Sequence, residues 1–229
     1  MVKIVEDIIN LFFPETCMYC GIEVERSGNL LCFSCLSDLP LTHFSFMPKN
    51  RLENSFRGRI PVNSATALLY FHKKGMAQQL IDQLKYHNRQ RIGTYLGDWL
   101  GEEIISSGRF ASIDLIVPVP LHPDKEKKRG YNQVTTFAES LSRKIGAPMV
   151  PDLLVKVSAS VTQTHKNRVE RALNKDNEFK LMDRGRLVNQ HVLLVDDIIT
   201  SGATLEGCWT PLQQVEGIKI SLASMAFTV

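Results

Sequence analysis

The distribution of apolar positions changes from residue 63 onward, where short apolar runs alternate with longer segments whose apolar residues recur at helical spacing. The apolar runs predict strands over 63–75, 113–122, 149–158, 191–197 and 219–229. The periodic segments predict helices over 76–107 with a break around Asn88, over 132–146 with Gly146 as a C-terminal cap, and over 203–215. Strands that alternate with helices favour a parallel sheet covered on both faces, so we predict an α/β fold.

The first 60 residues follow a different pattern. Ile4, Ile8 and Leu11 repeat at helical spacing and predict a short amphipathic helix that ends before Pro14. Residues 14–60 are rich in Cys, Pro, Gly and Asn, have little periodicity and cannot build a core of their own. We therefore predict two units, an N-terminal helix with a small cysteine-rich domain over 1–60 and the α/β domain over 61–229.

Composition narrows the protein class only a little. The 229 residues are 44% hydrophobic and 22% charged, which is typical of a globular protein, and the net charge of +3 does not by itself indicate a nucleic-acid binder. No apolar run reaches the ~20 residues that a membrane span needs. Glu6 and Asp7 interrupt the apolar N-terminus and no small-residue cleavage site follows, which argues against a signal peptide. We expect a cytoplasmic protein without a membrane span.

Four cysteines form the pattern C-x2-C-x11-C-x2-C, namely Cys17, Cys20, Cys32 and Cys35. Two thiolates that are two residues apart can chelate one metal ion from a tight turn, and two such pairs form a closed S4 site of the kind that zinc prefers. Two disulfides are the alternative, although the expected cytoplasmic location disfavours them. A zinc ion with four protein ligands has no open position for catalysis, so its role would be structural. Cys208 lies on a predicted helix, where we expect a buried apolar side chain.

The strand over 191–197 ends in two adjacent acids, Asp196 and Asp197, and a loop of small and hydroxylic residues follows them. The main-chain N–H groups of this loop can surround a phosphate at the start of the next helix, and Gly202 lets the backbone approach closely. The two carboxylates can accept hydrogen bonds from vicinal ribose hydroxyls. A ribose 5-phosphate satisfies both features. The predicted phosphate loop consists of Thr200, Ser201, Gly202, Ala203 and Thr204.

The stretch "LLVDDIITSGATL", residues 193–205, resembles the phosphoribosyl pyrophosphate (PRPP) signature of type I phosphoribosyltransferases. Together with "CMYC…CFSC", "LKYHNR", "VPVPLHPDKEKKRGYNQ" and "TQTHKNRVERALN", in that order, it resembles the ComF family, which includes competence proteins of bacterial DNA uptake. The resemblance covers nearly the whole chain. It implies a type I phosphoribosyltransferase-like parallel sheet flanked by helices, with a small N-terminal zinc-binding domain, and PRPP with Mg²⁺ as the ligand.

The resemblance also implies where the pyrophosphate of PRPP would lie. The corresponding loop is Val119-Pro120-Leu121, which lacks glycine and in which Pro120 has no N–H to donate. The following basic run can compensate with its side chains or can be a solvated charged loop; it consists of Lys125, Lys127, Lys128 and Arg129. Three further residues fall where the family has a flexible loop that closes over the reacting centre, namely Gln163, Lys166 and Arg168. We assign Asp196, Asp197 and Lys166 to catalysis.

Two functions remain open from the sequence. The first is transfer of a phosphoribosyl group to an unknown acceptor, for which no residue can be assigned. The second is a non-catalytic module that binds PRPP or a related nucleotide and handles single-stranded DNA or competence-machinery proteins. The basic residues Lys49, Arg51, Arg57 and Arg59 surround Phe56, which could stack on a base, or they could belong to a solvated linker. A purely structural zinc adaptor would leave the residues at 193–205 unexplained.

Overall fold

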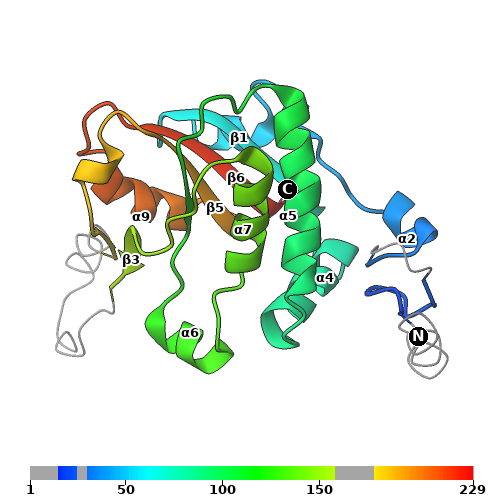
Figure 1. Cartoon of the computed structure of the whole chain (residues 1–229). Coiled ribbons are helices and arrows are strands. Elements are labelled where there is room, and N and C mark those ends of the chain that lie inside the picture. The colour runs from blue at the N-terminus through cyan, green and yellow to red at the C-terminus, as the bar shows by residue number, and fades with distance from the viewer. Residues whose placement is uncertain (1–14, 25–29, 158–177, 229) are drawn as a thin grey trace, which may run out of the picture.

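The structure is a computed structural model and describes residues 15–24, 30–157 and 178–228 (Figure 1). The helix predicted before Pro14 lies outside the described residues, as does the basic segment 159–177. None of the helices in the described part of the chain is both long and apolar enough to cross a membrane.

The core of the fold is a four-stranded parallel sheet with the strand order β1-β6-β5-β2. Its strands are β1 (Val62–Phe71), β2 (Leu115–Pro118), β5 (His191–Ile199) and β6 (Lys219–Thr228). The prediction of a parallel sheet built from these apolar runs is confirmed. In a parallel sheet the carboxyl ends of neighbouring strands meet at one edge, so the segments that follow β2 and β5 lie side by side.

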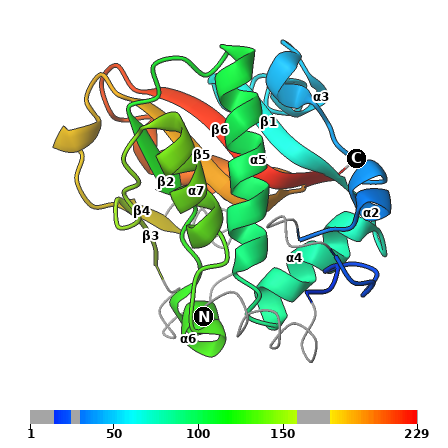
Figure 2. The same ribbon diagram turned by 45° about the vertical axis from the view of Figure 1, so that its right-hand side comes forward.

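Alternate residues of the central strand β5 contribute to two separate cores. Leu193 and Val195 pack on one face of the sheet, and Val192 and Leu194 pack on the other. The first face is covered by α4 (Met76–Tyr86), α5 (Arg91–Ser107) and α7 (Thr135–Ile145) (Figures 1 and 2). The second face is covered chiefly by α9 (Ala203–Leu212). The interruption between helices α4 and α5 around Asn88 is as predicted. The C-terminal cap of α7 at Gly146, with φ of +80°, is also as predicted.

Three elements differ from the prediction. The strand predicted over 113–122 is only four residues long, and the charged run after it forms helix α6 (Pro123–Arg129). The strand β3 (Leu154–Lys156) pairs antiparallel with β4 (Phe179–Leu181), apart from the main sheet. A single turn of 3-10 helix, η4 (Gly185–Leu187), precedes β5.

Helix α6 buries no residue, so hydrophobic periodicity could not reveal it. Its ends carry the signals of a helix instead. The ring of His122 accepts a hydrogen bond from the N–H of Asp124, Pro123 occupies the first turn, and Gly130 ends the helix with φ of +86°. Acidic residues in the first turn and basic residues in the last complement the helix dipole.

The cysteine-rich segment packs against the first face of the sheet domain through α4. Its apolar residues Leu30, Leu31 and Leu39 belong to the same core as α4 and α5. The amide of Gln83 on α4 donates to the carbonyl of Met18 over 2.5 Å. This segment contains the short helix α2 (Phe33–Ser37). It has no separate core among the described residues, as its composition predicts, whereas the division of the chain at residue 60 stays a prediction.

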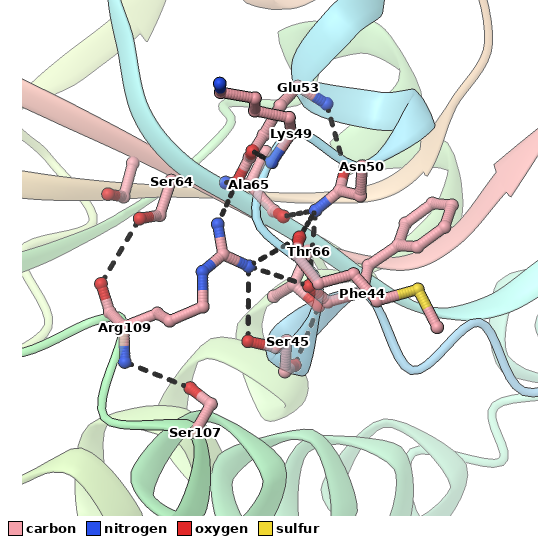
Figure 3. A network of polar contacts seen from close by, with 12 residues as sticks. Phe44, Ser45, Lys49, Asn50, Glu53, Ser64, Ala65, Thr66, Ser107 and Arg109 are labelled. Atoms are coloured by element: carbon pink, nitrogen blue, oxygen red, sulfur yellow. Dashed lines mark hydrogen bonds and ion pairs between the residues drawn. The ribbon is translucent and has the colours of Figure 1, made fainter.

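Residues 44–60 form η1 (Phe44–Phe46) and α3 (Arg51–Ser55), which a buried polar network attaches to the sheet domain (Figure 3). Arg109 donates to the carbonyls of Phe44, Ser45 and Met47 over 2.9, 3.2 and 2.9 Å and forms an ion pair with Glu53. The other carboxylate oxygen of Glu53 accepts the N–H of Lys49 over 2.6 Å. Because one guanidinium binds three carbonyl groups in and next to η1 as well as Glu53 of α3, the network fixes α3 and the residues that follow it.

Candidate functional site

A cleft of about 290 Å³ opens at the carboxyl ends of β2 and β5. It lies where ligands bind in open α/β sheets, beyond the ends of neighbouring strands. The lining combines two acids with the side chains of three lysines and one arginine. It comes from the loop after β2, from β5 itself, from α4, α6, α9 and β3, and from the segment before α7. The lining residues are Lys85, Tyr86, Val119, Pro120, Leu121, His122, Lys125, Arg129, Gln133, Lys156, Asp196, Asp197, Ile198 and Thr204.

Several residues that the sequence analysis assigned to PRPP lie together in this cleft. They come from three separate segments, and they are Val119, Pro120, Leu121, Arg129, Asp196, Asp197 and Thr204. Thr200, Ser201, Gly202 and Ala203 belong to the loop that leads from the acid pair to Thr204. Gln163, Lys166 and Arg168 lie outside the described residues. The role of each residue stays a prediction.

The acid pair lies inside β5 rather than after it, and both acids are nearly buried, with 9% of Asp196 and 8% of Asp197 exposed. The two side chains alternate along the strand. Asp197 faces the side of α4, where its Oδ2 lies 2.5 Å from Nζ of Lys85 and accepts the amide of Gln133 over 2.9 Å. Asp196 Oδ1 accepts the N–H of Asp197 over 2.8 Å. Asp197 therefore has a cation partner, whereas no ion pair joins Asp196 to another described residue.

The pKa of Asp196 reflects this difference. Burial, followed by the negative charge of Asp197, raises the pKa of the Asp196 carboxyl to about 7. Lys85 opposes the shift from a greater distance. A carboxyl with this pKa can accept or release a proton near neutrality, and a ligand that donates a hydrogen bond to it would favour the ionised form.

Sequence reasoning missed the two side chains that contact the Asp197 carboxylate, Lys85 and Gln133. Lys85 comes from the last turn of α4 and has 15% of its side chain exposed. Gln133 connects Asp197 to the guanidinium of Arg129, which donates to the Gln133 amide oxygen. Both residues belong to segments quoted for the family resemblance, "LKYHNR" and "RGYNQ", so the resemblance contained the signal although it did not assign a role.

The phosphate loop rests on a support that the sequence did not reveal. Gly202 has φ of +79°, and a Cβ atom at this position would lie 2.6 and 2.7 Å from two ring atoms of Phe56. Arg59 donates to the carbonyl of Ser201 over 2.8 Å and pairs with Glu206 of α9 over 2.5 Å. The suggestion that Phe56 stacks on a base is wrong, because only 1% of this residue is exposed and its ring packs beneath the loop.

The loop has the donors that an anion needs. Helix α9 starts at Ala203, so the N–H groups of Thr204 and Leu205 have no intrahelical partner. The residues Thr200, Ser201 and Thr204 are exposed and carry hydroxyl groups. A helix of ten residues also directs the positive end of its dipole to this point. These donors can bind a phosphate group.

The loop after β2 offers few backbone donors. The N–H of Val119 is already bonded to the carbonyl of Val195 over 2.8 Å, and Pro120 has none. A second anion in the cleft would therefore depend on side chains. Of the basic run, Lys125 and Arg129 line the cleft, whereas Lys127 and Lys128 do not.

The four cysteines lie together, with their sulfur atoms within 4.8 Å of one another. All four are free thiols in the structure, so the alternative of two disulfides does not match it. Burial acts to raise the pKa of the Cys17 thiol, but hydrogen bonds from the backbone N–H groups of Cys20, Cys32 and Tyr19 outweigh it and lower this pKa to about 6. A cluster of thiols with N–H donors to sulfur could hold a metal ion such as zinc. Cys208 is buried, as predicted.

Comparisons with known proteins agree with this architecture. A model of the phosphoribosyl transferase domain matches residues 135–227. "Competence protein F" of Haemophilus influenzae is 32% identical over 130 residues, which cover 55% of this chain and 57% of that protein. "DNA utilization protein YhgH" of Escherichia coli K12 is 30% identical over 192 residues, which cover 82% of this chain and 80% of that protein. The chain spans a little over half the length of the Haemophilus protein and of the Salmonella typhi protein of the YhgH type.

Among solved structures, the glutamine PRPP amidotransferase of Bacillus subtilis is 19% identical with a TM-score of 0.42, and the match covers 62% of this chain and 30% of that one. The sheet topology, the domain match and the four-cysteine cluster agree with a type I phosphoribosyltransferase fold that carries a cysteine-rich N-terminal region. Because the E. coli relative is 30% identical across 80% of its own length, the chain belongs to the ComF family.

Proposed function

We propose that the cleft binds PRPP as its magnesium complex and that the protein transfers the phosphoribosyl group to an acceptor or uses PRPP as a ligand. One observation carries the proposal. An acid pair, a helix start with free N–H groups and two cationic side chains meet in a single cleft. A ligand that has vicinal hydroxyls between two phosphate-bearing ends is complementary to all three features.

PRPP would lie across the cleft with its 5-phosphate on the side of α9 and its pyrophosphate on the side of α6. The 5-phosphate would take the loop 200–204, and the ribose 2- and 3-hydroxyls would donate to Asp196 and Asp197. The pyrophosphate would face Lys125 and Arg129. In a PRPP molecule bound as its magnesium complex, part of the pyrophosphate charge would already be neutralised, and these two side chains would meet the remainder. Lys85 supplies a positive charge next to Asp197 inside the cleft.

The transfer would need little covalent chemistry from the protein. The bond between C1 of the ribose and the pyrophosphate oxygen breaks, an oxocarbenium-like centre develops, and a nucleophile of the acceptor forms the new bond to C1. The side chains of Lys125 and Arg129 would stabilise the negative charge of the departing pyrophosphate. The buried acid pair would favour the positive charge that develops on the ribose.

Release of pyrophosphate from PRPP and magnesium tests whether transfer occurs. With a panel of bases and amines as acceptors, we expect release with at least one acceptor from the wild-type protein. The Asp196→Asn and Asp197→Asn variants should release little, because each lacks one ribose contact. If the wild-type protein releases no pyrophosphate with any acceptor but binds PRPP, the protein uses PRPP as a ligand only.

The names of the relatives favour the second candidate role, that of a module linked to DNA uptake. They are called competence and DNA utilization proteins, which supports a place for this chain in the use of incoming DNA. Such a role is compatible with a cleft that binds PRPP without turnover. Binding without pyrophosphate release would favour it over transfer.

We further propose that the metal of the four-cysteine cluster is zinc with a structural role. Purified protein should contain one zinc ion per chain by elemental analysis, because four thiolates form a closed tetrahedral site. The Cys32→Ser variant should lose this zinc and its protection against proteolysis near α2, since structural zinc contributes directly to folding. Cys208→Ser, which changes a cysteine outside the cluster, should retain zinc. A folded wild-type protein with four reactive thiols and no metal would contradict the assignment.

A further inference from the structure

A second pocket of about 390 Å³ adjoins the cleft, between the C-terminal end of α4 and helix α6. It shares four lining residues with the cleft and adds three of its own. The shared residues are Lys85, Tyr86, Lys125 and Arg129, and the additional ones are Asn88, Lys128 and Tyr131. The two cavities therefore lie side by side, and a molecule in one can contact a molecule in the other.

Aromatic side chains give this pocket a flat apolar surface. Tyr86 is 71% exposed, although a ring of this size usually packs against other side chains. The guanidinium of Arg129 lies 5.6 Å from the centroid of the Tyr86 ring. Tyr131 is held by a hydrogen bond from its hydroxyl to the carbonyl of Leu84. The guanidinium lies over one face of a ring that is still largely exposed, and such a ring can stack a planar aromatic ligand on its other face.

The charge of the pocket favours an anion. Lys125, Lys128 and Arg129 line it, and none of the three forms an ion pair with another residue that the structure describes. Lys85 is already paired with Asp197 in the cleft. The acids of α6, Asp124 and Glu126, are not among the described residues that line the pocket. Three cations without carboxylate partners form an anion-binding surface.

We propose that this pocket binds a single nucleotide, which is an aromatic base that carries a phosphate group. The base would stack on Tyr86 within reach of the Asn88 amide, and the phosphate would bind Lys125 and Lys128. The volume is within the range of small-molecule sites. The inference rests on the proposed function, because the shared wall at Lys85 and Arg129 would place the nucleotide next to the phosphoribosyl ligand as the second occupant of the site.

The test uses a nucleotide that the phosphoribosyl cleft should not accept. Thymidine 3'-monophosphate has neither a 5'-phosphate nor a 2'-hydroxyl, and its binding is measured by calorimetry with and without saturating ribose 5-phosphate. We expect saturable binding in both conditions. Thymidine and inorganic phosphate, each with one half of the recognised chemistry, should bind at least about tenfold more weakly.

Matched variants locate the binding. Lys128→Gln should weaken nucleotide binding about tenfold, and Tyr86→Ala should do the same through the lost stacking, whereas Tyr86→Phe should retain it. Lys127→Gln removes a neighbouring charge of α6 that does not line the pocket and should change nothing. The affinity for ribose 5-phosphate should be unchanged in Lys128→Gln, because Lys128 does not line the cleft.

The outcomes separate the two proposals. If ribose 5-phosphate binds but the nucleotide does not, or if ribose 5-phosphate displaces the nucleotide, the second pocket is not a nucleotide site and the proposed function stands. If Lys127→Gln and Lys128→Gln have equal effects, the nucleotide binds elsewhere and the inference is overturned. If the nucleotide binds as expected and ribose 5-phosphate does not bind, the inference holds for the pocket and the proposed function fails.

Discussion

Replacement of Gly202 by alanine should reduce PRPP binding by at least about 100-fold. Two costs combine at this position. The residue has φ of +79°, which costs an L-amino acid about 1–2 kcal/mol. The new Cβ would also lie 2.6 Å from the Phe56 ring, which is itself buried and cannot withdraw. The loop would have to move away from Phe56, and the N–H groups that face the phosphate would move with it.

Gly146→Ala provides the matched control. Gly146 has φ of +80°, and nothing lies within 4 Å of a Cβ at this position. Alanine at position 146 has the same unfavourable positive φ but no clash of its Cβ with a neighbouring side chain. We therefore expect this variant to be destabilised by about 1 kcal/mol and to bind PRPP normally. Calorimetry gives the affinities and thermal unfolding gives the stabilities. Equal PRPP affinities for the two variants would show that the Phe56 support does not matter.

Lys85→Met should destabilise the protein by about 3 kcal/mol at pH 8, measured by urea unfolding, because it leaves two adjacent buried carboxylates without a cation. Lys85 Nζ lies 2.5 Å from Asp197 Oδ2, and 15% and 11% of these side chains are exposed. Methionine retains most of the apolar stem of lysine, so the lost charge accounts for most of the effect.

The deficit of Lys85→Met should shrink as the pH falls. The pKa of Asp196 in the folded protein is raised to about 7, well above the value for an exposed aspartate, so its ionisation opposes folding as the pH rises from about 4 through 7. Loss of Lys85 raises this pKa further and enlarges the penalty above neutrality. Below pH 4 the carboxyl is protonated in both states and the penalty disappears.

A double-mutant cycle separates the ion pair from packing effects. Asp197→Asn removes the partner, and the double variant Lys85→Met/Asp197→Asn removes both charges. We expect the double variant to be more stable than the sum of the two single effects predicts. Additive effects together with a deficit that does not change between pH 4 and pH 8 would show that Lys85 contributes through packing alone.

The elements that the sequence predicted correctly have strong local signals. The strand β5 contains a run of buried aliphatic residues, which identifies it as a strand. Helix α7 has apolar residues at helical spacing and ends at a glycine cap, and these two signals identify it as a helix. The loop after β2 lies next to the acid pair of β5 because neighbouring parallel strands end at the same edge of the sheet, so the predicted topology was enough to place them together. The cysteine cluster followed from spacing alone.

What the sequence did not predict depends on tertiary contacts. Helix α6 buries nothing, and the ribbon β3–β4 has three residues on each strand, so neither has a periodic signal. Lys85 reaches Asp197 across 112 positions of the chain because α4 packs on the same face of the sheet. Phe56 was interpreted as an exposed aromatic residue within a basic segment, yet the Arg109 network places it beneath the phosphate loop.

The same network connects a distant part of the chain to the site. Arg109, which follows the Gly108 cap of α5, holds η1 and α3 through backbone carbonyls and Glu53. The residues after α3 then support the loop through Phe56 and Arg59. Residues 44–60 therefore support the phosphate loop, although they lie far from it in the sequence.

The most direct test of the proposed ligand is calorimetry of ribose 5-phosphate and 2-deoxyribose 5-phosphate on the wild-type protein and on Asp197→Asn. The carboxylates should account for the selectivity, because a hydrogen bond to a charged acceptor contributes roughly 1.5–3 kcal/mol. We predict that the wild-type protein prefers ribose about tenfold to 100-fold, and that Asp197→Asn weakens ribose binding by a similar factor and loses most of the preference. Equal affinities in all four combinations would contradict the account, because the acid pair would then have no part in ribose recognition.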